Sequence, residues 1–123
     1  MTDAEPVTGP VIVRLPAEID IANAEDVGEQ LRSAFIPGVT LVIADLTATV
    51  FCDSSGLRQL LLAHRRAQAR RAEVRFAIPH REVVGVLEVT EVDRLLSVYP
   101  SLDAAMSARP APDGQNRQVR RIR

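Results

Sequence analysis

Residues 41–57 read LVIADLTATVFCDSSGL and carry the clearest structural signal in the chain. The run at 39–46 is almost continuously apolar, which is typical of a central strand covered on both faces. We expect residues 47–52 to continue that strand to the Asp-Ser-Ser-Gly turn at 53–56. Apolar residues at helical spacing then predict a helix over 57–71. A strand that leads directly into a helix indicates an α/β protein.

Strands and helices alternate along the rest of the chain. β-branched and apolar residues predict further strands at 11–15 and 73–78, with a loop and a short strand at 93–99. Helical spacing predicts helices over 24–35, 81–89 and 101–106. This order predicts a mostly parallel, mixed β-sheet with about four α-helices, joined by right-handed crossovers.

Length and composition indicate one domain with two flanking segments. The 123 residues suffice for a single core. Pro and Gly near the start suggest a flexible lead-in at 1–10, followed by a domain at 11–108. Pro, Gly, Asn, Gln and Arg without core periodicity predict a disordered basic tail at 109–123. The simplest interpretation of the tail arginines is that they are solvated.

The overall composition argues against several classes of function. The net charge is -1 and aromatic residues make up only 3%, which disfavours direct nucleic-acid binding. No apolar run is long enough to span a bilayer, and the N-terminus lacks the blocks of a signal peptide, so we expect a cytoplasmic protein. Cys52 is the only cysteine, which excludes an intrachain disulfide and a cysteine-based metal cluster.

The turn at 53–56 permits two interpretations. Asp53, Ser54 and Ser55 can satisfy free N–H groups at a helix start, which is ordinary architecture. A serine hydroxyl on the first helical turn can also carry a phosphate where the helix end favours negative charge. We interpret Asp53 as a cap, or as a group that orients a serine hydroxyl, rather than as a catalytic base.

A second polar loop, at 17–23, also follows a predicted strand. Sites in open α/β sheets gather beyond the carboxyl ends of strands, so this loop and the turn at 53–56 are expected to meet at one edge. Asp20 is either a turn residue or part of a recognition surface. Asn23 is a candidate N-cap for the helix that follows.

Other chemically active side chains have plainer explanations. Cys52 is expected to be a small buried hydrophobe. His64 and His80 lie far apart in the sequence without partners at metal-ligand spacing, so we expect no metal site and no cofactor. A basic cluster suits the C-terminus of the second helix, where it is either solvated or contacts an acidic patch on a partner. Its members are Arg65, Arg66, Arg70 and Arg71.

Residues 42–57 resemble the signature of STAS domains, and more closely that of bacterial anti-sigma factor antagonists. The similarity extends over nearly all of 11–106. Residues 18–24 resemble the first loop and helix start of that family, and 89–105 resemble its closing strand and helix. The resemblance implies a STAS-like fold.

The resemblance also implies a function and its site. Family members use the serine directly before the glycine as phosphoacceptor, which is Ser55 here, with Asp20 and Asp53 beside it. Ser54, Gly56 and Asn23 complete the expected surroundings of that serine. The implied kinase is an anti-sigma factor that binds the unphosphorylated antagonist and releases a sigma factor. Phosphorylation ends the binding, and a phosphatase restores it; the antagonist itself is not an enzyme.

Two alternatives stand beside this interpretation. Some STAS modules work without phosphorylation, with a small ligand, a lipid-transport system or a transporter as partner. An enzyme with Ser55 as nucleophile is disfavoured, because no His–Asp partner set or oxyanion loop is recognisable. One departure from the family concerns Ala17, where a glycine is common. If that position needs a positive φ, alanine costs about 1 kcal/mol or more.

Overall fold

Four parallel strands form the central sheet of the computed structural model, which describes residues 9–109. The strands lie in the order β1-β3-β5-β6, and each neighbouring pair is parallel. Their bounds are Val11–Arg14, Leu41–Asp45, Glu73–Ala77 and Ser97–Tyr99 for β1, β3, β5 and β6. The mostly parallel sheet predicted from the sequence is confirmed.

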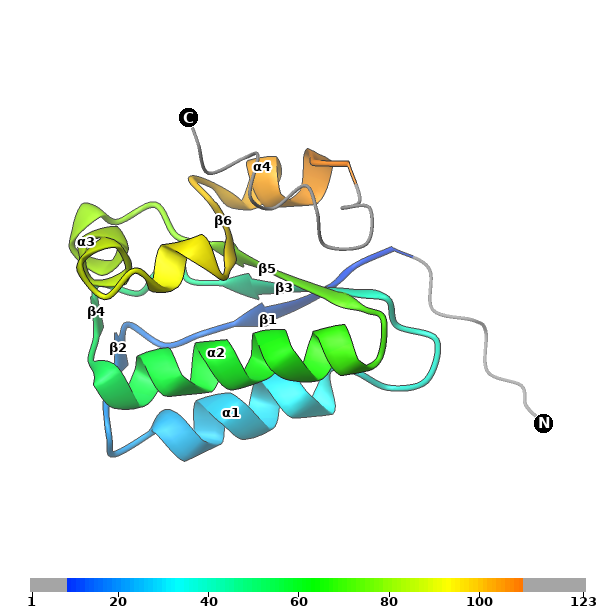
Figure 1. Cartoon of the computed structure of the whole chain (residues 1–123), viewed down its shortest axis with the longest axis horizontal. Helices are drawn as coiled ribbons and strands as arrows, with labels where there is room; N and C mark the ends of the chain where they lie inside the picture. The colour runs from blue at the N-terminus through cyan, green and yellow to red at the C-terminus, as the bar shows by residue number, and fades with distance from the viewer. Residues whose placement is uncertain (1–8, 110–123) are drawn as a thin grey trace.

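Helices cover both faces of this sheet (Figure 1). Helices α1 (Ala24–Ser33) and α2 (Ser54–Ala69) lie side by side on one face, and the short α4 (Leu102–Ser107) lies on the other. Helix α3 (Arg81–Val89) and the 3₁₀ turn η1 (Val92–Arg94) pack together at one end of the molecule, near the short strand β4 (Phe51–Cys52). The expectation of about four α-helices is therefore confirmed.

Alternate residues of β3 supply the two sides of the core. Val42 and Ala44 belong to the main cluster, which includes Leu60 of α2. Ile43 belongs to the second cluster, which includes Ala105 of α4. All these side chains are buried. Because both faces of β3 are covered, the strand reads as a continuous apolar run, as expected of a central parallel strand.

A buried arginine holds α4 against the sheet. Arg75 in β5 is 1% exposed, and its Nε lies 3.0 Å from a carboxylate oxygen of Glu73. Its guanidinium also donates to the carbonyl oxygens of Ala105 at 2.6 Å and Arg109 at 3.1 Å. The charge is therefore paired and hydrogen-bonded, which is the condition for burying an arginine.

The predicted extension of the central strand through residues 47–52 is wrong. Strand β3 ends at Asp45, whose carboxylate accepts from the N–H of Thr47 at 2.9 Å and so turns the chain. Residues Phe51–Cys52 form β4, which pairs in parallel with β2 (Glu18–Ile19) in a separate two-stranded sheet. Part of the predicted loop at 17–23 is thus a strand.

The predicted lead-in at 1–10 and the predicted tail at 109–123 lie almost wholly outside the described residues. Between residues 9 and 109, no helix combines the length and apolar character needed to cross a bilayer.

Candidate functional site

The two-stranded β2/β4 sheet brings the two polar turns together. Its register pairs Glu18 with Phe51 and Ile19 with Cys52. The ladder continues into the second turn, because the N–H of Asp53 donates to the carbonyl oxygen of Ile19 at 3.0 Å. The loop that begins at Asp20 therefore starts beside the turn at 53–56, as expected from the strand order.

Asp53 is the N-cap of α2. Its backbone is extended, and its carboxylate accepts from the N–H of Gly56 at 3.1 Å. Its carbonyl oxygen accepts the first helical bond, from the N–H of Leu57 at 2.9 Å. The side chain therefore performs the capping role that the sequence suggested, and the negative charge suits the helix N-terminus.

The two serines occupy the first turn of α2 without serving as caps. Ser54 is exposed and Ser55 is half-buried. Neither hydroxyl makes a hydrogen bond within the described residues, and the same holds for the N–H groups of Ser54 and Ser55. The first turn of α2 therefore presents free donors and an uncommitted hydroxyl at Ser55.

Gly56 allows α2 to pack closely on the β2/β4 sheet. A Cβ atom at this position would lie 2.6 Å from Sγ of Cys52 and 2.6 Å from Cγ2 of Ile19. The glycine thus fixes the distance between the helix start and the sheet, and with it the position of Ser55. Burial, together with the charge of Asp53, raises the pKa of the Cys52 thiol to about 11, so this thiol stays protonated.

Asp20 and Asn23 stabilise their own loop. The Asp20 carboxylate accepts from the N–H of Ala22 at 3.0 Å. The Asn23 amide accepts from the N–H of Asp20 at 2.9 Å and donates to the carbonyl oxygen of Glu18 at 2.8 Å. Asn23 occupies the N-cap position of α1, but its side chain bonds backward and caps no helical N–H. Side-chain capping of α1 by Asn23, as predicted, is therefore wrong.

The departure at Ala17 carries no strain. Ala17 is not among the residues with a positive φ, so the cost considered for a missing glycine does not arise. Its carbonyl oxygen accepts from the N–H of Val50 at 2.8 Å, which ties the start of the loop to β4. The fold thus accommodates alanine at this position.

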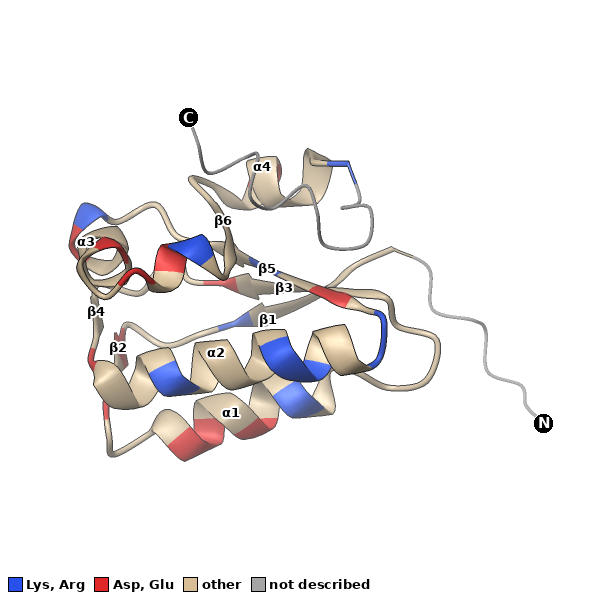
Figure 2. Cartoon of the chain, viewed as in Figure 1, with Lys and Arg blue, Asp and Glu red and all other residues tan. Residues whose placement is uncertain are grey.

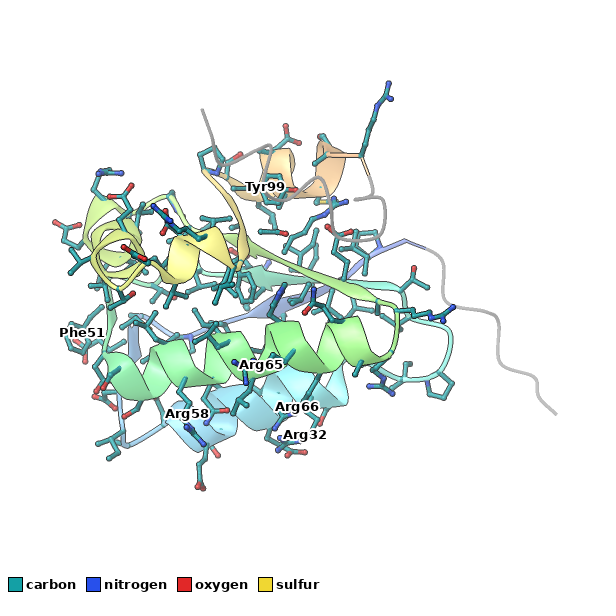
Figure 3. All side chains as sticks on the ribbon, in the orientation of Figure 1. Arg32, Phe51, Arg58, Arg65, Arg66 and Tyr99 are labelled. Carbon is teal, nitrogen blue, oxygen red and sulfur yellow. The ribbon has the colours of Figure 1, made fainter. Side chains whose placement is uncertain are left out.

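Exposed apolar side chains flank the two turns. Ile21 is 81% exposed in the first loop, and Phe51 and Val50 are each 48% exposed at β4. Figure 3 shows Phe51 at the same end of the molecule as the start of α2. The sequence predicts Phe51 only as part of the extended central strand, because two residues of β4 show no pattern that distinguishes them from an extension of β3. Exposed apolar groups around a polar site are typical of a protein-binding surface.

The described residues contain no group of three His, Cys, Asp or Glu side chains arranged to hold a metal ion. His64 is buried in α2. His80 precedes α3, and its Nε2 lies 3.1 Å from the carbonyl oxygen of Thr47. The two histidines therefore occupy separate structural positions.

Comparisons with known proteins agree with this architecture. The crystal structure of a putative anti-sigma factor antagonist from Thermotoga maritima matches with a TM-score of 0.71 at 22% identity, covering 83% of this chain and 88% of that chain. The anti-sigma factor antagonist SpoIIAA in its unphosphorylated form matches with a TM-score of 0.62 at 26% identity, covering 77% and 84%.

The fold also occurs in a transport-related protein. A sulfate transporter family protein from Wolinella succinogenes matches with a TM-score of 0.66 at 15% identity, covering 85% of this chain and 87% of that chain. The model of one family, described as the STAS domain, matches residues 2–105. The chain therefore belongs to the STAS domain family.

Proposed function

We propose that this protein is an anti-sigma factor antagonist that acts in the cytoplasm and is controlled by phosphorylation of Ser55. The observation that carries the proposal is the uncommitted, half-buried hydroxyl of Ser55 on the capped first turn of α2. The similarity to SpoIIAA, an antagonist known in unphosphorylated and phosphorylated forms, supports the same reading. The protein acts as a binding module, and the chemistry belongs to its partner.

The partner is an anti-sigma factor that is also a serine kinase with its own ATP and magnesium. Transfer moves the γ-phosphoryl group of ATP to Oγ of Ser55; ADP leaves and the hydroxyl proton is released. The unmodified antagonist occupies the anti-sigma factor and frees a sigma factor. A phosphatase later hydrolyses the phosphoserine and restores binding.

Two electrostatic effects of the phosphate oppose each other within the domain. The modification adds about −1.5 to −2 charges. Near a helix N-terminus a negative group gains about 0.3–1 kcal/mol. Repulsion from Asp53 opposes this, because like charges about 4 Å apart repel by about 1 kcal/mol in water and more at lower dielectric. We therefore expect the fold to change little on phosphorylation.

The partner interface responds more strongly than the fold. Ile21 in the first loop and Phe51 in β4 are exposed and would offer apolar contact area to the anti-sigma factor. A phosphate on Ser55 must lose water without a counter-charge from these side chains when the partner docks. A hundredfold loss of affinity needs only about 2.7 kcal/mol, which is within the range of such a cost.

Phosphopeptide mapping tests the site. The protein is incubated with candidate anti-sigma factor kinases of the same organism and ATP, then digested and analysed by mass spectrometry. We expect one phosphate on Ser55, full loss of labelling in Ser55→Ala and normal labelling in the neighbouring control Ser54→Ala. Label on Ser54, or label that persists in Ser55→Ala, would contradict the assignment.

The alternative function is a STAS module that works without phosphorylation. Its support is the occurrence of the fold in transport-related proteins such as the Wolinella succinogenes protein. That function predicts binding of a small ligand or a transporter partner that is unaffected by Ser55→Ala. Thermal-shift assays with nucleotides, or a ligand that copurifies, would favour it over the phosphorylation switch.

A further inference from the structure

Arg58 is an isolated cationic side chain near the start of α2. Residues 54–64, about the first three turns of the helix, contain no other lysine or arginine and no aspartate or glutamate. Figure 2 shows this basic position in the first half of α2, apart from the basic positions near its C-terminal end. The proposed phosphoacceptor Ser55 therefore shares the first turns of its helix with a single arginine.

The spacing of Arg58 and Ser55 makes them neighbours on the surface of α2. Residues three positions apart on a helix have Cβ atoms about 5–6 Å apart. Helical side chains lean toward the N-terminus, so a long side chain at position 58 can reach the turn that contains Ser55. An acidic group that precedes its basic partner along a helix is the more favourable of the two orders. A phosphate on Ser55 would precede Arg58 in this way.

The charge of Arg58 has no partner in the unmodified protein. Its side chain is exposed, and among residues 9–109 it forms no ion pair and no side-chain hydrogen bond. Glu25 and Asp26 of α1 line the same surface groove as Arg58, but neither carboxylate forms an ion pair with it. Each carboxylate carries one charge, whereas a phosphoserine carries about −1.5 to −2. A phosphate on Ser55 would therefore attract this guanidinium more strongly than the two acids do.

We propose that Arg58 is the intramolecular counter-charge of phosphorylated Ser55, an inference that rests on the proposed function. The modification gives an exposed, unpaired guanidinium a partner on its own helix. Arginine suits this role because its planar group can donate two parallel hydrogen bonds to phosphate oxygens. Arg58 binds the modified side chain and takes no part in phosphoryl transfer.

The pair accounts for a fold that tolerates a phosphate close to Asp53. The carboxylate of Asp53 accepts from the N–H of Gly56, so it cannot turn away from a neighbouring phosphate without losing that hydrogen bond. Arg58 supplies the opposite charge within the same part of the helix, and its attraction opposes the repulsion from Asp53. The first turn of α2 can therefore keep its cap while it carries the modification.

Phosphorus NMR of the full chain with phosphoserine encoded at position 55 tests the pair. The phosphoserine enters during translation, so the experiment needs no kinase. A nearby guanidinium favours the doubly charged phosphate, so the second pKa of the phosphate should lie at least about 0.3 below its value in Arg58→Gln. This difference should fall by about half in about 0.5 M salt, because salt screens exposed charges.

Arg65→Gln is the matched control for Arg58→Gln. Arg65 is exposed on the same helix, and its position ten residues after Ser55 places it about 15 Å further along the axis. Its loss should leave the phosphate pKa within about 0.1 of the original. Arg58→Lys keeps the charge without the paired donors and should give an intermediate pKa. Equal pKa values in the original and in Arg58→Gln, or an equal rise in Arg65→Gln, would overturn the pairing.

Urea denaturation adds a thermodynamic cycle between phosphorylation and Arg58→Gln. In the unmodified protein the substitution should change the unfolding equilibrium constant by less than about twofold, because no ion pair is lost. In the phosphorylated protein it should raise that constant about two- to fivefold further. The same rise in both forms would assign Arg58 a structural role and overturn the pairing. Absence of label at Ser55 in the kinase mapping would instead refute the proposed function, because the encoded phosphoserine reports the pair independently.

Discussion

In the turn at 20–23 the polar side chains bond to the backbone of their own loop, whereas in the turn at 53–56 only Asp53 does so. The side-chain amide of Asn23 accepts a hydrogen bond from the N–H of Asp20 and donates one to the carbonyl oxygen of Glu18. Ser54 and Ser55 make no side-chain hydrogen bond within residues 9–109. The two turns meet at one edge, so this difference separates a loop stabilised by its own side chains from a turn with serine hydroxyls that make no hydrogen bond. Substitutions of the structural residues in both turns should therefore lower stability, whereas substitutions of Ser55 should leave stability nearly unchanged.

The largest loss of stability is expected for Gly56→Ala. The new Cβ would lie 2.6 Å from side-chain atoms of Cys52 and of Ile19, and both side chains are buried and have little room to move. We expect the free energy of unfolding, measured by urea denaturation, to fall by about 2–3 kcal/mol. This result would show that the position of the turn at 53–56 depends on the close packing of Gly56 against Cys52 and Ile19.

Gly85→Ala is the control for Gly56→Ala. Gly85 lies inside α3, and a Cβ there would meet nothing within 4 Å. The substitution should raise the free energy of unfolding by about 0.5–1 kcal/mol, because alanine loses less backbone entropy in a helix. Equal effects at the two glycines would contradict the assigned role of Gly56.

The second-largest loss of stability is expected for Asn23→Ala in the loop at 20–23. The substitution removes two hydrogen bonds and leaves the N–H of Asp20 and the carbonyl of Glu18 to water. We expect a loss of about 1–2 kcal/mol in the free energy of unfolding. Hydrogen exchange should also accelerate at Asp20.

Asn23→Asp serves as a partial replacement. The carboxylate can still accept from Asp20 but cannot donate to Glu18, so it should recover about half of the lost stability. If Asn23→Ala were neutral while Asn23→Asp were destabilising, the backward-bonding role of Asn23 would be wrong.

A smaller effect is expected for Asp53→Ala, which removes the cap of α2. The N–H of Gly56 loses its acceptor, and the expected cost is about 1 kcal/mol in urea denaturation. Asp53→Ser keeps a capping oxygen and should recover most of the loss. If Asp53→Ser lost as much stability as Asp53→Ala, the negative charge of Asp53, and not its hydrogen bond, would supply the stability.

Some of these structural features could be predicted from the sequence, and others could not, for physical reasons. The continuous apolar run of β3 reports burial on both faces, so its central position was predictable. The cap at Asp53 follows from local chemistry. Strands β2 and β4 have only two residues each, which is too short for any periodicity to appear. The role of Gly56 depends on Ile19, a contact distant in sequence that no local pattern reveals.

The smallest changes in stability are expected for substitutions of Ser55. Ser55→Ala removes a hydroxyl without a hydrogen bond, so the free energy of unfolding should change by less than about 0.5 kcal/mol. Ser55→Asp should also change it little, because attraction by the free N–H groups of α2 opposes repulsion by Asp53. Urea denaturation and circular dichroism check both variants.

The same two variants should differ sharply in their affinity for the proposed partner, an anti-sigma factor kinase. Ser55→Ala keeps an uncharged surface beside Ile21 and Phe51 and should bind within about threefold of the original. Ser55→Asp places a charge there and should bind at least about tenfold more weakly, as measured by calorimetry. Unfolding of Ser55→Asp, or equal affinity of both variants, would remove the physical basis of the switch. A switch that acts through the interface requires the fold to tolerate the charge that the partner rejects.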